Sequence, residues 1–278
     1  MEFRKGHGTG NDFVLLPDPD GQLALTPALV AALCDRRRGI GADGVLRVVR
    51  SAKHPDAANH ATDAEWFMDY WNADGSSAEM CGNGVRVFTR FLIDSGWAAP
   101  AAGGLPVATR TGIVRVVVGE GSIAVDMGLP RRYARSAASV AGRSVPGIAV
   151  NVGNPHLVCP LPPDVPLSTV DLSGPPGFDK TLFPAGVNVE FFAPVPGPGV
   201  HVRMRVHERG VGETLSCGSG ACAVAAVAAD AGVGSRGTVV VEVPGGRLTV
   251  EFDGTTCWLA GPAVLVARGE VDAAALAA

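Results

Sequence analysis

Apolar and polar residues alternate in short runs along much of the chain, and glycine or proline separates many of these runs. The clearest run is 200–206 (VHVRMRV), where every second side chain is apolar, as expected for a strand with one face in water. Glycine and proline between such runs are typical of turns between strands. The pattern therefore predicts a sheet-rich chain, with strands near 45–49, 113–118, 122–127, 200–206, 238–243, 247–252 and 263–267.

Three segments have the features of helices. Thr26 and Pro27 suit the N-cap and first position of a helix that we expect to reach about Asp35. Residues 84–95 place an apolar stripe on one helical face, and 220–231 are apolar nearly all round, as in a helix buried on every side. Few helices among many strands predict an α/β (α+β) fold, in which strands surround one buried helix in each half of the chain.

Two halves of the chain share one order of motifs. Residues 10–14 (GNDFV) resemble 153–158 (GNPHLV), and 80–84 (MCGNG) resemble 216–220 (SCGSG). Asn72 also stands nine residues before Cys81, and Glu208 nine before Cys217. Three matches in one order predict two homologous halves related by a pseudo-twofold, divided near residue 122 into 1–122 and 123–264.

Composition narrows the class of protein. The 278 residues are 47% hydrophobic and have a net charge of −4. No Lys/Arg run suits a nucleic-acid groove, and no apolar run suits a signal peptide or a membrane span, so we expect a cytoplasmic protein without nucleic-acid or membrane partners. The six cysteines are scattered, without CxxC or paired histidines, which favours reduced thiols and no metal site.

Cys81 and Cys217 each stand in a C-G-x-G turn that opens a predicted helix. A helix N-terminus presents unpaired N–H groups and partial positive charge, which lower the pKa of a thiol and hold a carboxylate. Two such turns could grip one α-carboxylate and place a sulfur on each face of the α-carbon. One thiolate would then remove the α-proton while the other thiol returns a proton to the opposite face.

Most cysteines, however, act as small buried hydrophobic residues. We interpret four of the six in this way: Cys34, Cys159, Cys222 and Cys257. Either C-G-x-G turn alone is equivocal, and the repeat is what favours function for Cys81 and Cys217.

The motifs resemble those of the diaminopimelate epimerases, in order from about residue 1 to residue 268. The matching segments are 7–13 (HGTGNDF), 39–44 (GIGADG), 72–76 (NADGS), 80–84 (MCGNG), 153–156 (GNPH), 186–188 (GVN), 208–210 (ERG), 216–220 (SCGSG) and 244–246 (PGG). The resemblance implies two halves, each a curved, mostly antiparallel sheet around a central helix, with 265–278 returning to the first half. It also implies a homodimer without pyridoxal phosphate or metal, which interconverts LL- and meso-2,6-diaminopimelate in lysine and cell-wall precursor biosynthesis.

The resemblance also implies roles for single residues. Cys81 and Cys217 would be the two acid/bases, supported by His156 and Glu208. The reacting carboxylate would be held by Gly82, Asn83, Gly218 and Ser219. The rest of the substrate would be recognised by Asn11, Asn72, Asn154, Asn188 and Arg209, where the arginine suits a carboxylate. Alone, Asn11 and Asn154 would be interpreted as turn residues. The less favoured alternative for Arg209 is a surface ion pair with Glu208 or Glu213.

Two departures and three alternatives accompany this interpretation. Gly44 stands where some family members have Gln, and the loop 51–63 is long without chemical features. A proline or hydroxyproline racemase-type enzyme would have His at the position of Asn83. A pyridoxal-phosphate racemase would need a Schiff-base lysine beside a phosphate site. A thiol redox protein would pair Cys81 with Cys217.

Overall fold

The computed structural model describes residues 1–276. The chain divides into two compact units, unit 1 (Met1–Val125 with Pro262–Ala278) and unit 2 (Asp126–Gly261). The boundaries expected from the sequence fall after 122 and 264, three residues from the observed ones in each case (125 against 122, 261 against 264).

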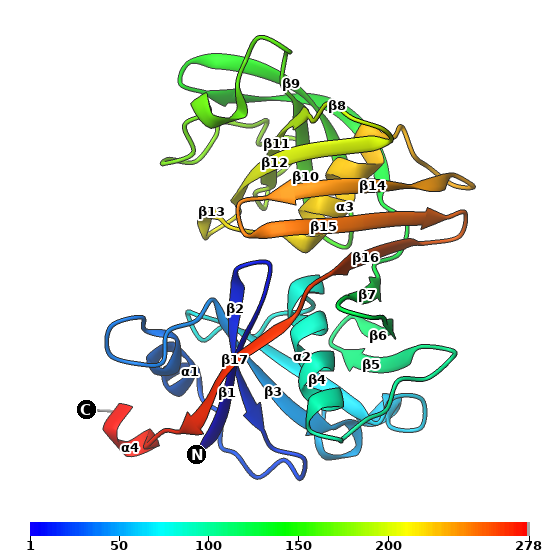
Figure 1. Ribbon diagram of the computed structural model, residues 1–278. Helices are drawn as coiled ribbons and strands as arrows, with labels where there is room; N and C mark the ends of the chain where they lie inside the picture. The colour runs from blue at the N-terminus through cyan, green and yellow to red at the C-terminus, as the bar shows by residue number, and fades with distance from the viewer. Residues whose placement is uncertain (277–278) are drawn as a thin grey trace. The chain divides into compact units, whose positions relative to one another are not determined.

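Unit 1 is built on a run of strands that pair side by side (Figure 1). Neighbours run antiparallel except for the parallel pairs β2–β3 and β4–β5. The strands in spatial order are β17 (Val264–Glu270), β1 (Glu2–Gly8), β2 (Asn11–Pro17), β3 (Gly44–Arg50), β4 (Trp66–Asn72), β5 (Leu105–Thr109), β6 (Gly112–Val118) and β7 (Ile123–Asp126).

Unit 2 has a sheet of the same design. Its parallel pairs are β10–β11 and β12–β14, and its other neighbours run antiparallel. The strands in spatial order are β8 (Arg131–Val140), β9 (Arg143–Asn151), β10 (Pro155–Pro160), β11 (Asn188–Pro194), β12 (Val200–Glu208), β14 (Arg236–Val243), β15 (Gly246–Asp253) and β16 (Cys257–Gly261). The short β13 (Gly212–Thr214) pairs with the end of β12.

The two sheets have the same sequence of strand directions. Counted from β17 in unit 1 and from β8 in unit 2, the pairs are antiparallel, antiparallel, parallel, antiparallel, parallel, antiparallel and antiparallel. The last strand of the chain therefore fills in unit 1 the place that β8 fills in unit 2. This confirms the duplication, and β17 pairs with β1 from Glu270 opposite Glu2 onward.

Each unit has one buried helix at the same point of the repeat. Helix α2 (Gly82–Asp94) follows β4 and packs on β1, β2, β3, β4 and β17, and α3 (Gly218–Ala228) follows β12 and β13 and packs on β9 to β12 and β14 to β16. Both helices begin two residues earlier than the sequence suggested, because each cysteine is itself the N-cap. Helix α3 also ends at Ala228, short of the expected 231.

The remaining helices are short and peripheral. Thr26 caps α1 (Pro27–Cys34) by accepting from the Leu29 amide at 3.2 Å, as the sequence predicted. The other short helices are η1 (Ser51–Lys53), η2 (Ala58–His60), η3 (Leu167–Thr169) and α4 (Ala273–Leu276). The loop 51–63 thus contains two 3₁₀ turns, and Ala57 anchors it in a small core beside Phe67.

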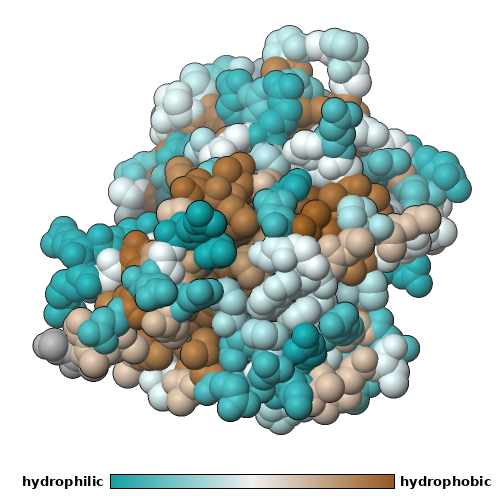
Figure 2. Space-filling view, turned by 60° about the horizontal axis from the view of Figure 1, so that its bottom comes forward, coloured by the Kyte–Doolittle hydropathy of each residue, from teal (hydrophilic) through white to brown (hydrophobic). Residues whose placement is uncertain are grey.

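The surface has no dominant apolar area on the face in Figure 2, where hydrophilic and hydrophobic residues are interspersed. The most exposed large hydrophobic residues, Val233, Val211 and Val266, belong to separate segments. Among residues 1–276, no helix combines the length and apolar content needed to span a bilayer.

Candidate active site

Cys81 is held at the first turn of α2 by the backbone. Its φ of −142° and ψ of 117° are extended, and its Sγ accepts from the Gly84 amide at 3.4 Å. The sulfur therefore occupies the position of a capping oxygen, where helix N–H groups favour negative charge. The side chain is half-buried rather than sealed in the core.

Asn11, at the start of β2, is the polar neighbour of Cys81. Its Oδ1 lies 3.6 Å from Cys81 Sγ and 3.2 Å from Asn83 Nδ2, and its Nδ2 donates to Asp43 at 2.8 Å. The carboxylate of Asp43 fixes which way the amide faces. Asn11 thus presents an acceptor oxygen to the sulfur.

A cluster of charges outside Asn11 holds this segment in place. Asp12 accepts from Lys5 at 2.5 Å and from Arg36 at 2.7 Å, and Arg36 also contacts Asp43 at 2.7 Å. Burial raises the pKa of Asp12, but hydrogen bonds from Arg36 and Lys5 outweigh it and lower the pKa to about 2. The Asp12 carboxylate is therefore ionised at neutral pH and ties Arg36 to β2.

Arg86 is a site residue that the sequence did not reveal. It is fully buried in α2, and its Nη2 donates to Asn83 Oδ1 at 2.9 Å and to Thr9 Oγ1 at 3.4 Å. Gly8 leaves room for it, since a Cβ there would lie 3.0 Å from Nη2. The guanidinium orients the Asn83 amide and adds positive charge near the first turn of α2.

Asn72 and Gly44 face each other across β3 and β4. Asn72 Nδ2 donates to Ser76 Oγ at 3.0 Å, within the turn after β4. A Cβ on Gly44 would lie 2.5 Å from the Trp71 carbonyl oxygen and 2.8 Å from Tyr70 Cε2. The backbone here leaves no space for a side chain, so glycine is required at residue 44.

Cys217 caps α3 as Cys81 caps α2. Its φ and ψ are −117° and 114°, and its Sγ accepts from the Gly220 amide at 3.4 Å. Ser219 Oγ lies 3.6 Å from the sulfur. Cys217 is only 6% exposed. Burial, followed by the charges of Glu208 and Glu190, raises the pKa of its thiol well above 9, so the resting group is an acid.

Glu208 ends β12 beside Cys217. Burial raises its pKa, and Thr214 Oγ1 donates to its Oε1. His156, on β10, places Nδ1 2.6 Å from Glu190 Oε1 and Nε2 2.8 Å from Asn154 Oδ1. Glu208 and His156 therefore lie within the polar surroundings of Cys217, together with Glu190, which no sequence motif marks.

The side chain of Asn188 is hydrogen-bonded to the backbone amide of Arg209. The Arg209 amide donates to Asn188 Oδ1 at 2.9 Å, and its guanidinium donates from Nη1 to the Ala185 carbonyl at 3.2 Å. Glu213 instead pairs with Arg205 at 2.6 Å, and Glu208 accepts from Thr214. Arg209 is therefore not the ion-pair partner of Glu208 or Glu213.

The turn-residue interpretation of Asn11 and Asn154 is wrong. Positive φ is taken by the preceding glycines, 84° at Gly10 and 86° at Gly153, and both asparagines use their side chains in hydrogen bonds. The four cysteines interpreted as core residues are buried, as expected. Burial raises the pKa of Cys34 and Cys159 to about 12, which makes these two thiols inert at neutral pH.

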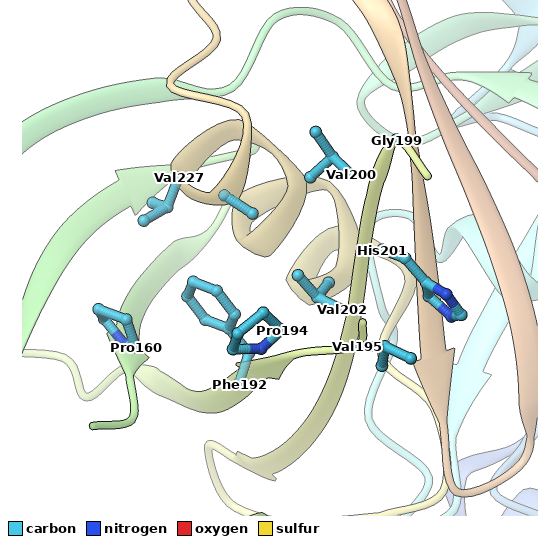
Figure 3. Close-up of a pocket in the computed structure, with 10 residues that line it drawn as sticks. Pro160, Phe192, Pro194, Val195, Gly199, Val200, His201, Val202 and Val227 are labelled. Carbon is cyan, nitrogen blue, oxygen red and sulfur yellow. The ribbon is translucent and has the colours of Figure 1, made fainter. Parts of the chain in front are cut away.

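A cavity of about 400 Å³ in unit 2 is lined largely by apolar side chains, among them Phe192, Pro194 and Val227 (Figure 3). It reaches α3 at Val227 and Ala228, near the C-terminal end of that helix. Cys217 caps the other end, roughly 15 Å away at 1.5 Å per residue. The cavity is therefore separate from the thiol chemistry.

Gly220 and Gly84 offer a matched test of the two turns. A Cβ at Gly220 would lie 2.7 Å from Glu190 Oε1 and 3.3 Å from Cys217 Sγ, whereas at Gly84 the nearest atoms are ordinary contacts at 3.4–3.6 Å. Gly220→Ala is expected to lower the free energy of unfolding by about 1–3 kcal/mol through overpacking. Gly84→Ala should change it by less than about 1 kcal/mol, since alanine also favours the helix. Urea denaturation of both variants measures this, and equal tolerance at the two positions would contradict the packing around Glu190.

Comparison with known proteins agrees with the motifs. The profile of the family described as diaminopimelate epimerase matches residues 3–133 and 148–272. The chain is 52% identical to the diaminopimelate epimerase of Thermobifida fusca, covering 99% of this chain and 100% of that one. It is 51% identical to that of Streptomyces coelicolor, covering 99% and 96%.

Solved structures of more distant proteins share the fold. A phenazine biosynthesis protein of the PhzF family from Bacillus anthracis gives a TM-score of 0.66 at 17% identity, covering 98% of each chain. A probable proline racemase from Agrobacterium radiobacter gives 0.65 at 15% identity, covering 98% of this chain and 92% of that one. At this identity the likeness concerns the fold alone.

Proposed function

The chain belongs to the diaminopimelate epimerase family, and from that premise we propose that it interconverts LL- and meso-2,6-diaminopimelate with two thiols, Cys81 and Cys217, and without a cofactor. The observation that supports the two-thiol assignment is that Cys81 and Cys217 cap the N-termini of α2 and α3 in the same way. Each sulfur ends a strand-to-helix turn in the same backbone conformation and accepts the amide three residues later at 3.4 Å. Such duplication is expected where one reaction needs an acid and a base of the same kind.

The proton balance of the proposed reaction is simple. A thiolate takes the α-proton, the C–H bond breaks, and its electron pair moves toward the carboxylate. The second thiol then gives its S–H proton to the opposite face of the α-carbon, and the first sulfur keeps the proton that it took. The thiol of Cys217, whose pKa burial raises, suits the donor when Cys81 is the base, and the roles exchange in reverse.

The amides of the two turns are the groups that we assign to the reacting carboxylate. Unpaired N–H groups at a helix start stabilise the negative charge that grows there as the proton leaves. We assign Gly82 and Asn83 in α2, and Gly218 and Ser219 in α3, to this task. His156 and Glu208 are assigned to handle protons beside Cys217.

The distal end of the substrate is itself a zwitterionic amino acid. We assign four asparagines and one arginine to it, since amides both donate and accept and a guanidinium suits a carboxylate. These residues are Asn11, Asn72, Asn154, Asn188 and Arg209. We further propose that the enzyme is a cytoplasmic homodimer that acts in lysine and cell-wall precursor synthesis.

Deuterium exchange tests the proposal directly. Reduced protein incubated with LL-diaminopimelate in D₂O is expected to incorporate deuterium at one α-carbon and to form the meso isomer. Activity should survive dialysis against a chelator with reductant present. Activity lost on dialysis and restored by a metal ion or by pyridoxal phosphate would overturn the cofactor-free proposal, and the absence of exchange would overturn the proposed substrate.

A further inference from the structure

Glu190 is a buried acid to which the proposed reaction gives no role. It lies on β11 with 0% of its surface exposed. In the parallel pairing of β10 with β11, His156 stands opposite Asn188 and Val158 opposite Glu190. Since side chains alternate along a strand, Asn188 and Glu190 share the face on which His156 lies. The register therefore places the carboxyl group against the imidazole and under the first turn of α3.

The two carboxyl oxygens of Glu190 have different surroundings. Oε1 lies 2.6 Å from His156 Nδ1, and a Cβ on Gly220 would come within 2.7 Å of it. Oε2 is buried and has no hydrogen-bond partner among the residues that the structure describes. An ionised carboxylate with one oxygen unsatisfied in the core would cost far more than a neutral acid with a free carbonyl.

We propose that Glu190 is a positioning residue of this active site, which stays protonated, donates to His156 Nδ1, and through His156 fixes the Asn154 amide as a donor for the substrate. The assignment to substrate rests on the proposed function, whereas the proton positions rest on the contacts alone.

The position of each proton follows from the two hydrogen bonds that link Glu190, His156 and Asn154. Asn154 Oδ1 can only accept, so His156 Nε2 carries a proton and donates across the 2.8 Å contact. With that proton on Nε2, a neutral imidazole leaves Nδ1 as an acceptor for the acid O–H of Glu190. Because Oδ1 of Asn154 is thereby occupied, its Nδ2 group is left to donate, which suits a substrate carboxylate.

The charges around Glu190 favour the same state. Titratable groups face it from three elements: His156 on β10, Glu208 on β12, and Cys217 on α3, whereas Cys159 of β10 points to the other face of the sheet. Burial raises the pKa of Glu190, and a negative charge on it would raise the pKa values of Glu208 and Cys217 further. A neutral Glu190 therefore makes it easier for Cys217 to become a thiolate when it acts as the base.

Two substitutions in the full chain test the proposal. In Glu190→Gln the amide keeps one N–H donor for Nδ1 and one carbonyl, and so reproduces the protonated acid. In Glu190→Leu a side chain of similar size makes no hydrogen bond. We expect KM for diaminopimelate and kcat within about threefold of the parent for Gln, and KM raised about tenfold or more for Leu, with kcat less affected.

Nitrogen-15 NMR of histidine-labelled protein supplies a readout that does not depend on turnover. We expect His156 to show the neutral, Nε2-protonated pattern in the parent and in Glu190→Gln, as the contacts with Glu190 and Asn154 require. An imidazolium pattern in the parent that disappears in Glu190→Gln would overturn the proposal, as would a Gln variant as defective as the Leu variant. If Glu190→Leu fails to fold, the comparison of the parent with Glu190→Gln by NMR and by kinetics still tests the proposal. A parent without diaminopimelate turnover would count against the proposed function and leave the NMR result unaffected.

Discussion

Replacing either Cys81 or Cys217 by serine is expected to lower the rate of epimerisation by about 10²–10⁴-fold, the usual contribution of one acid or base. Inversion needs one group to take a proton and another to return one on the opposite face. A hydroxyl is much less acidic than a thiol, and it is a poor base without an activating partner. Since Oγ can accept the amide of Gly84 or Gly220 as Sγ does, both variants should remain folded.

The assay starts each variant from each stereoisomer and follows inversion and α-deuterium uptake separately. A variant that keeps one thiol should still exchange the proton on that side more readily than it inverts the centre. Cys34→Ala is the matched control, because Cys34 lies in the core of unit 1 and burial raises its pKa to about 12. The control should stay within about twofold of the parent rate if the fold tolerates the small cavity. A serine variant that inverts at the parental rate would mean that its cysteine is structural.

The C-G-x-G turns could be predicted because their information is local. A short stretch of sequence sets a helix start, and the glycines allow close approach of the backbone, so the caps at Cys81 and Cys217 follow from the motif. Strands such as β2 and β11 were missed. The run FVLL in β2 is wholly apolar and VEFFA in β11 is interrupted only by Glu190, and such short runs do not distinguish a buried strand from a helix by periodicity.

Arg86 and Glu190 could not be predicted as site residues because their roles depend on long-range pairing. Arg86 sits in the helix next to the apolar residues that form its stripe, and only the fold brings Thr9 to its Nη2. Glu190 faces His156 because β10 and β11 pair in one register, and a shift of one residue would turn its carboxyl to the other face. A charged residue inside an otherwise apolar run was the available signal in both cases.

Replacing Arg209 by alanine is expected to lower kcat/KM for diaminopimelate by more than tenfold. Arg209 is itself exposed, so its pair with the distal carboxylate becomes desolvated only where the bound substrate covers it, and loss of one partner of such a desolvated pair costs on the order of 2–5 kcal/mol. The arginine is placed for such a role by its backbone amide, which Asn188 holds at 2.9 Å, and by Gly186, whose φ of 85° brings the backbone against the arginine stem. A Cβ at Gly186 would lie 2.9 Å from Arg209 Cδ, so glycine at residue 186 lets the arginine side chain pass close to the backbone.

Lysine at position 209 should restore only part of the activity, because an ammonium cannot make the planar, two-point contact of a guanidinium. Arg203→Ala is the matched control: Arg203 is an exposed arginine of β12 that pairs with Glu242 at 2.6 Å. Since surface ion pairs contribute little, the control should leave kcat/KM within about twofold of the parent. Steady-state kinetics on LL-diaminopimelate compare the three variants. If Arg209→Ala behaves like the control, the contact with the Ala185 carbonyl is the whole of its role, and the distal carboxylate must be bound by the asparagines alone.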